Sequence, residues 1–147
     1  MKRLIHPLVA GLLAGLFMAH PARAEVIDEI AVVHRDSIAS IELRLTGPVR
    51  YLRHYPAELG EAVVVILEAP TPETFDVTSP LDEVKRGPKN SGAPRFTVRV
   101  SLKRACSPAP NPVCLTLAFE RPVRYRVRLG EDRRVVVVDL LPQGREP

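Results

Sequence analysis

Hydrophobic and polar residues alternate along much of the chain after residue 25, as they do in β-strands with one buried face. Segment 38–45 alternates in this way, and so does segment 95–103. Two aliphatic runs, 63–67 and 135–138, lack alternation, which is typical of strands buried on both faces. No window of about 11 residues shows the 3.6-residue period of an amphipathic helix. The pattern therefore predicts an all-β chain.

Turn residues divide this pattern into about eight or nine short strands. We expect strands at 26–33, 38–45, 49–55, 62–68, 81–86, 95–103, 113–119, 123–129 and 135–140. A proline-rich linker is expected at 69–80. Short strands at this spacing are typical of sandwiches and barrels. Strands with one wet face, together with strands buried on both faces, favour a two-layer sandwich.

One stretch of sequence occurs twice. Pro-Val-Arg-Tyr stands at 48–51 and at 122–125, and each copy is followed by Gly-Glu and then by one of the aliphatic runs. Each copy also follows an alternating strand and an earlier segment with two adjacent acids, at 27–30 and 81–84. Four matched features in the same order indicate an internal duplication. We therefore expect a β-sandwich built from two pseudo-symmetric halves of about four short strands each. The expected bounds are 26–69 and 81–141 for the halves, 25–143 for the single domain and 144–147 for a tail.

The first 24 residues have the form of a secretory signal peptide. Lys2 and Arg3 precede an uncharged apolar run at 8–19, and the small-x-small sequence Ala-Arg-Ala ends at Ala24. A membrane anchor is the alternative, but a spanning helix needs about 20 apolar residues. We expect export to the periplasm with cleavage after Ala24, and no membrane insertion of the remaining chain.

Net charge changes with that cleavage. The whole chain has a formal net charge of +4, which falls to +1 when Lys2, Arg3 and Arg23 are removed. The distribution is uneven, because residues 25–84 hold 4 basic and 12 acidic side chains whereas residues 85–147 hold 14 and 5. Such asymmetry indicates a charged partner, or else two halves that neutralise each other within the fold.

Two cysteines, Cys106 and Cys114, flank a loop with three prolines. In an exported chain two cysteines most simply pair with each other. A metal site would need more ligands, and a redox site would usually show a C-x-x-C spacing. We expect a structural disulfide.

The sequence shows no catalytic, metal-binding or cofactor-binding constellation. His34 and His54 are the histidines that follow the expected signal peptide, and their spacing is not that of metal ligands. Adjacent acids, such as those at 28–29 and 82–83, point to opposite faces of a strand and are poor acid–base partners. We therefore expect a protein that is not an enzyme and that needs no cofactor or metal.

Arginine gives the strongest surface signal. One set of basic residues alternates with apolar residues in the strand expected at 123–129, and a second set does so at 95–103. The candidate ligand-binding residues are Arg124, Arg126 and Arg128 in the first set and Arg95, Arg99 and Lys103 in the second. Guanidinium groups suit carboxylate and phosphate ligands. The alternative is a solvated strand face that discourages edge pairing. Nucleic acid is not an expected partner, because export argues against it and only Phe96 and Tyr125 could stack on bases.

The duplicated pattern resembles the AMIN domain, an all-β targeting module. The second half carries the resemblance at 84–87, 115–119, 122–125 and 135–140, the last segment ending in Asp-Leu. The first half carries it at 43–51, but its final strand reads Val-Ile-Leu-Glu at 65–68 instead of ending in Asp-Leu. The cysteine hairpin is an addition to the family pattern.

The resemblance implies a β-sandwich of two similar small sheets. AMIN domains occur in periplasmic cell-wall amidases and in secretins, where they help to localise the host protein by contact with peptidoglycan. We therefore expect a non-enzymatic cell-envelope binding or targeting module that contacts peptidoglycan through its arginine-rich sheet face. The alternative is a structural adaptor that binds another envelope protein, namely a secretin, pilus or tetratricopeptide-repeat partner.

Overall fold

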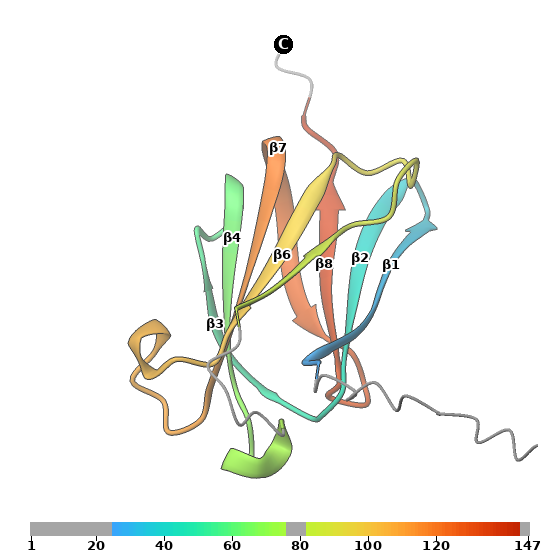
Figure 1. Cartoon of the computed structure of the whole chain (residues 1–147). Helices are drawn as coiled ribbons and strands as arrows, with labels where there is room; N and C mark the ends of the chain where they lie inside the picture. Colours follow the sequence, from blue (N-terminus) through green and yellow to red (C-terminus); the bar gives the residue numbers. More distant parts are fainter. Residues whose placement is uncertain (1–24, 76–81, 145–147) are drawn as a thin grey trace, which may run out of the picture.

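The computed structural model describes residues 25–75 and 82–144. The expected signal peptide, residues 76–80 of the expected linker, the first residue of the strand expected at 81–86 and the last three residues of the tail lie outside the described residues. The strands are β1 (Ile27–Arg35), β2 (Ile38–Leu45), β3 (Arg50–Tyr55), β4 (Leu59–Glu68), β5 (Asp82–Arg86), β6 (Phe96–Ser101), β7 (Pro112–Leu129) and β8 (Val135–Leu141). Two short 3-10 helices are η1 (Pro72–Thr74) and η2 (Arg104–Cys106). The all-β fold class is confirmed (Figure 1).

The strands form two layers that share β7. The hydrogen-bonded order is β1-β2-β8-β7-β4-β3, and β6 and β5 continue from β7. The first part of β7, residues 112–119, pairs with β4 and β6, whereas residues 124–129 pair with β8. Val123 and Arg124 also pair with Gly60 and Leu59 at the start of β4. One layer therefore consists of β1, β2, β8 and the second part of β7, and the other consists of β3, β4, the first part of β7, β6 and β5.

The length of β7 corrects the predicted break between strands 113–119 and 123–129, because the chain continues as one strand through Pro122. Residues 120–122 have no partner in the described ladders with β4, β6 or β8. A proline there removes no ladder hydrogen bond, so the strand tolerates it.

The two copies of the repeated sequence exchange strands. The first copy's alternating strand β2 pairs with the second copy's aliphatic strand β8, and the second copy's β7 pairs with the first copy's β4. In the first copy β1 pairs with the alternating strand β2, and in the second copy β6 pairs in the same way with β7. Segment 27–30 lies in β1, whereas residues 82–84 lie in β5, which pairs with β6 and has no counterpart in the first copy. The predicted correspondence of segments 27–30 and 81–84 is therefore wrong in terms of strand pairing.

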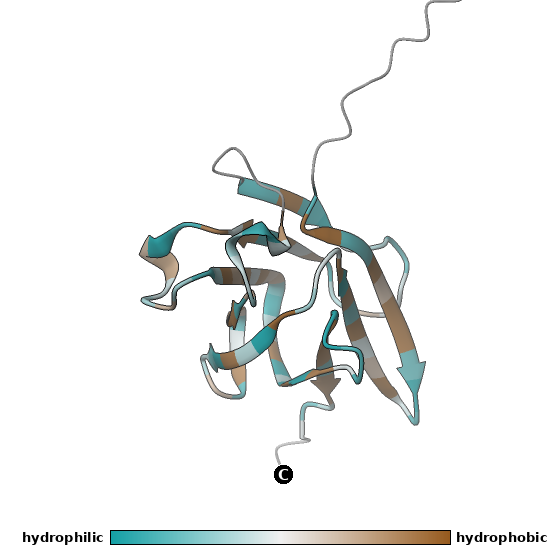
Figure 2. Ribbon diagram, turned by 90° about the horizontal axis from the view of Figure 1, so that it is seen from below, coloured by the Kyte–Doolittle hydropathy of each residue, from teal (hydrophilic) through white to brown (hydrophobic). Residues whose placement is uncertain are grey.

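Alternation decides which side chains enter the core between the layers. β4 contributes Val63, Val65 and Leu67, and β6 contributes Val98 and Val100, all fully buried. Figure 2 shows the strands arranged around this interior, with hydrophobic segments along the strands and hydrophilic ones toward loops and strand ends. Residues 135–138 of β8 are buried on both faces, as their lack of alternation predicts.

Two side chains of β5, Glu83 and Lys85, hold the start of β1. Buried Glu83 accepts hydrogen bonds from the backbone N–H groups of Val26, at 2.8 Å, and Ile27, at 3.3 Å. Lys85 Nζ lies 2.9 Å from a carboxylate oxygen of Glu25 and 3.5 Å from one of Glu83. These contacts fix the start of β1 against β5, so the adjacent acids at 82–83 have a structural role.

Candidate binding surfaces

The three arginines of β7 lie on the outer face of the layer formed by β1, β2, β8 and β7. The neighbouring side chains Val123 and Tyr125 are buried, so alternation turns Arg124, Arg126 and Arg128 outward, and all three are exposed. Antiparallel pairing places Arg126 opposite Asp139 of β8. The predicted arginine face therefore exists, and it surrounds a carboxylate.

Asp139 is 3% exposed although it points away from the core. Its oxygens accept hydrogen bonds from Arg126 Nη2 at 3.2 Å, from Arg128 Nε at 3.0 Å and from the Ser40 hydroxyl at 2.6 Å. Ser40 stands opposite Asp139 on β2. Three strands thus meet at one carboxylate, which we call the Asp139 site (Ser40, Arg126, Arg128 and Asp139).

The hydrogen bonds of the Asp139 site keep its carboxylate ionised. Burial raises the pKa of Asp139, but hydrogen bonds from Arg128, Ser40 and Arg126 outweigh burial and hold the pKa below its usual value. The hydrogen bond to Asp139 also raises the pKa of Arg128. Asp139 is therefore ionised, and Arg128 protonated, at neutral pH.

The face retains positive charge after these contacts. Two arginines, Arg126 and Arg128, share one carboxylate, and Arg124 makes no ion pair with a described residue. Asp139 holds two guanidinium groups in place, which lowers the entropy cost of their binding a ligand. Each guanidinium has more donors than Asp139 uses. The arrangement can bind anionic groups.

The basic residues of the second set lie on the other layer. Arg95, Arg99 and Lys103 are exposed along β6 and its ends. Lys103 Nζ lies 3.4 Å from Asp82 of β5, whereas Arg99 makes no ion pair with a described residue. Since the outer faces of two packed layers point apart, the two predicted sets do not form one surface.

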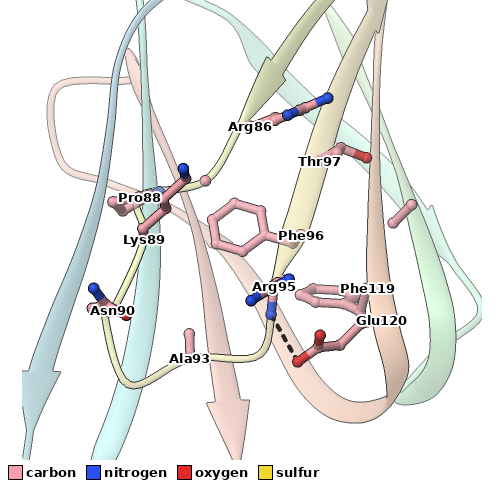
Figure 3. A pocket seen from close by; sticks show the side chains of 12 residues that line it. Arg86, Pro88, Lys89, Asn90, Ala93, Arg95, Phe96, Thr97, Phe119 and Glu120 are labelled. Carbon is pink, nitrogen blue, oxygen red and sulfur yellow. Dashed lines mark hydrogen bonds between the residues drawn. The ribbon is translucent and has the colours of Figure 1, made fainter.

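Arg95 belongs instead to a cleft beside the loop between β5 and β6. The cleft has a volume of about 630 Å³, and Arg86 and Lys89 line it with Arg95. Figure 3 shows the ring of Phe96 between β6 and the part of the loop that carries Pro88 and Lys89. Sequence reasoning missed Arg86 and Lys89, although a basic loop next to an alternating basic strand was a visible signal.

The two histidines in the described residues, His34 and His54, contact neighbouring polar groups of the fold. His34 Nε2 contacts the Ser91 carbonyl oxygen, and His54 Nε2 lies 2.8 Å from the Ala57 carbonyl oxygen. His54 Nδ1 lies 2.6 Å from the Tyr51 hydroxyl. Within residues 25–75 and 82–144, no three side chains from His, Cys, Asp and Glu form a group that could hold a metal ion. In the same ranges no helix is long and apolar enough to cross a membrane.

The predicted disulfide between Cys106 and Cys114 is confirmed. Cys114 lies at the start of β7 on the outer face, next to Ile66 of β4. Ile66 is 1% exposed despite its outward position. The segment 107–110 borders a hollow with Ile66, so the cysteine loop lies beside this part of the outer sheet.

Comparison of the chain with protein-family models, curated proteins and solved structures finds no match. The resemblance to AMIN domains therefore stays a prediction, and the function is argued from the surfaces described above.

Proposed function

We propose that this chain is a non-enzymatic binding or targeting module of the periplasmic cell envelope, and that its arginine-rich sheet face contacts peptidoglycan. The form of residues 1–24 supports export, and the duplicated pattern supports the likeness to AMIN domains. The ligand groups would be carboxylates of peptide stems, which match the planar donors of guanidinium.

The observation that carries the proposal is the Asp139 site. A buried carboxylate beneath two exposed arginines orients both guanidinium groups on a regular sheet, and Arg124 extends the row. An exposed ion pair contributes only about 0–1 kcal/mol, so useful affinity requires several contacts acting together. Such binding weakens as salt screens the charges.

Pull-down on purified sacculi tests the proposal. The exported chain should be retained at low salt and released at high salt. A triple variant with Arg124→Gln, Arg126→Gln and Arg128→Gln should lose most retention. Equal retention of the triple variant and the unaltered protein would refute a role for this face.

A charge-matched control separates this face from total charge. Arg53, Arg104 and Arg121 are exposed and make no ion pair with a described residue. Their combined replacement by glutamine removes the same three charges from other positions. This control should keep its retention, and equal losses in both triple variants would indicate nonspecific attraction.

The adaptor alternative is favoured by one observation, the open edges of the layers. β1 has nine residues, and among the described strands it pairs only with β2 and forms the end of its layer. A partner could add a strand to such an edge. This function predicts a stable complex with an envelope protein and no retention on sacculi, so the same pull-down distinguishes the two.

A further inference from the structure

The cleft beside the β5–β6 loop has the size and lining of a ligand site. Ligand pockets in proteins usually measure about 300–1,000 Å³ and combine apolar walls with a few polar groups. Here one side is the loop from Gly87 to Ala93, and the other consists of Thr97 of β6 and the stretch Ala118 to Glu120 of β7. Figure 3 shows these side chains around the Phe96 ring.

Two largely buried phenylalanines, Phe96 and Phe119, are 5% and 7% exposed and form an aromatic wall beneath the cleft. Phe96 and Phe119 are paired residues on β6 and β7, and their ring centroids lie 6.0 Å apart. Gly87 permits the loop to pass close to the Phe96 ring, because a Cβ at Gly87 would lie 2.4 Å from two ring carbons. The aromatic wall is therefore held by close packing on the loop side as well as on the core side.

Positive charge exceeds negative charge around this wall. Arg86, Lys89 and Arg95 line the cleft, and Glu120 is the one carboxylate among its lining residues. None of the three cations makes an ion pair with a described residue. Glu120 Oε1 accepts a hydrogen bond from the Arg95 backbone N–H at 3.2 Å, so this carboxylate already has a partner.

The loop is anchored at both ends and at its far side. The Gly87 N–H donates to the Phe96 carbonyl oxygen at 3.0 Å, and the Glu120 N–H donates to the Arg95 carbonyl oxygen at 3.0 Å. The His34 ring contacts the Ser91 carbonyl oxygen from β1. Because the walls of the cleft are already ordered, ligand binding costs little conformational entropy there.

We propose that this cleft binds a small anionic ligand that combines a carboxylate with a compact apolar part. The carboxylate would lie against the guanidinium of Arg95 and the ammonium of Lys89, since guanidinium forks match carboxylate geometry. The apolar part would lie against Pro88, Ala93 and Ala118, above the exposed edges of the Phe96 and Phe119 rings. Such a carboxylate belongs either to a free organic acid or to the end of a peptide chain.

Nuclear magnetic resonance titrations with two probes and their neutral amides test the proposal. The probes are N-acetyl-leucine and the acetylated tripeptide Ala-Ala-Leu with a free carboxylate. At least one probe should shift the amide resonances of Thr97, Ala118 and Phe119 in a saturable way, while its amide should not. Shifts with both probes indicate recognition of the shared carboxylate, and shifts with the tripeptide alone indicate a peptide end. No saturable shift with either probe, or equal shifts with the amides, would overturn the proposal.

Substitutions locate the binding within the cleft. Lys89→Gln combined with Arg95→Gln should weaken binding about tenfold, because exposed charge contacts contribute modestly and add. Arg99→Gln removes a charge from the same strand outside the cleft and should leave affinity unchanged. Ala118→Trp keeps every charge but fills the cleft, so it should abolish the shifts. Unchanged affinity in both cleft variants would contradict this location.

Binding in the cleft is independent of the proposed contact of the arginine-rich sheet face with peptidoglycan. Replacement of Arg126 and Arg128 should leave the probe titration unchanged, and replacement of Lys89 and Arg95 should leave retention on sacculi unchanged. Each proposal can therefore fail without the other.

Discussion

Asp139→Asn removes the charge at the centre of the outer sheet face while keeping the size of the side chain. Asparagine can still accept the hydrogen bond from Ser40 through its remaining oxygen. It cannot hold both guanidinium groups as a carboxylate does. The substitution therefore isolates the charged contacts that join β7 to β8.

The expected loss of stability follows from the exposure of the partners. The side chains of Arg126 and Arg128 are 64% and 46% exposed, so solvent screens both ion pairs. Each exposed pair is worth at most about 1 kcal/mol, and the total loss should be about 1–2 kcal/mol at pH 7. For a domain of about 120 residues, 1 kcal/mol corresponds to a change in Tm of about 4 °C.

The assay is denaturant unfolding of both proteins across a series of pH values. The pKa of Asp139 is lower in the folded protein than its ordinary value of 3.8. Its stabilisation is therefore complete above that ordinary value and is lost as pH falls through the folded pKa below it. The free energies of unfolding of the two proteins should differ at pH 7 and converge in strong acid.

Glu131→Gln provides the matched control, because Glu131 lies in the turn between β7 and β8 and makes no ion pair with a described residue. It should change the free energy of unfolding by less than about 0.5 kcal/mol. Equal stability of the Asp139 variant and the unaltered protein at pH 7 would refute the reasoning. A difference that persists unchanged in strong acid would also refute it, since the cause would then not be ionisation.

Three further predictions concern other parts of the fold. Glu83→Gln should lower the free energy of unfolding by about 1–3 kcal/mol in denaturant titration, because it weakens buried bonds to the backbone at the start of β1. Thiol titration of the unfolded, unreduced protein should find no free thiol, and replacing Cys106 and Cys114 by serine should cost up to about 2–3 kcal/mol; two reactive thiols would contradict this. Gly87→Ala should destabilise the fold by about 1–3 kcal/mol and shift the resonances of the Phe96 ring, whereas an unshifted ring would show that the loop gives way instead.

Most of the strands could be predicted from sequence because alternation follows directly from burial on one face. β2 has the bounds that its pattern predicts, 38–45. β1 extends two residues further than expected, to Arg35, because Asp36 and Ser37 adopt positive φ angles of 49° and 67° and form a tight hairpin turn. Asp-Ser lacks the glycine that usually signals such a turn, so the boundary was not visible in the sequence.

The candidate sites were only partly predictable for a different reason. Alternation correctly turned Arg126 and Arg128 outward, but strand register decides which residue faces them. Asp139 reads as the end of an aliphatic run, and only the pairing of β8 with both β2 and β7 brings it to Ser40 and the arginines. The cleft likewise depends on a loop that returns along β6, which no local pattern specifies.

The exchange of strands between the two copies has a consequence for fragments of the chain. A fragment of residues 25–75 would keep the hairpins β1–β2 and β3–β4. It would lack β8, the second neighbour of β2, and β7, the second neighbour of β4. Neither this fragment nor the rest of the chain could bury its aliphatic strand alone. The two fragments should therefore fold only when they are mixed. The intact chain should fold slowly, because the pairings of β2 with β8 and of β4 with β7 join residues far apart in sequence.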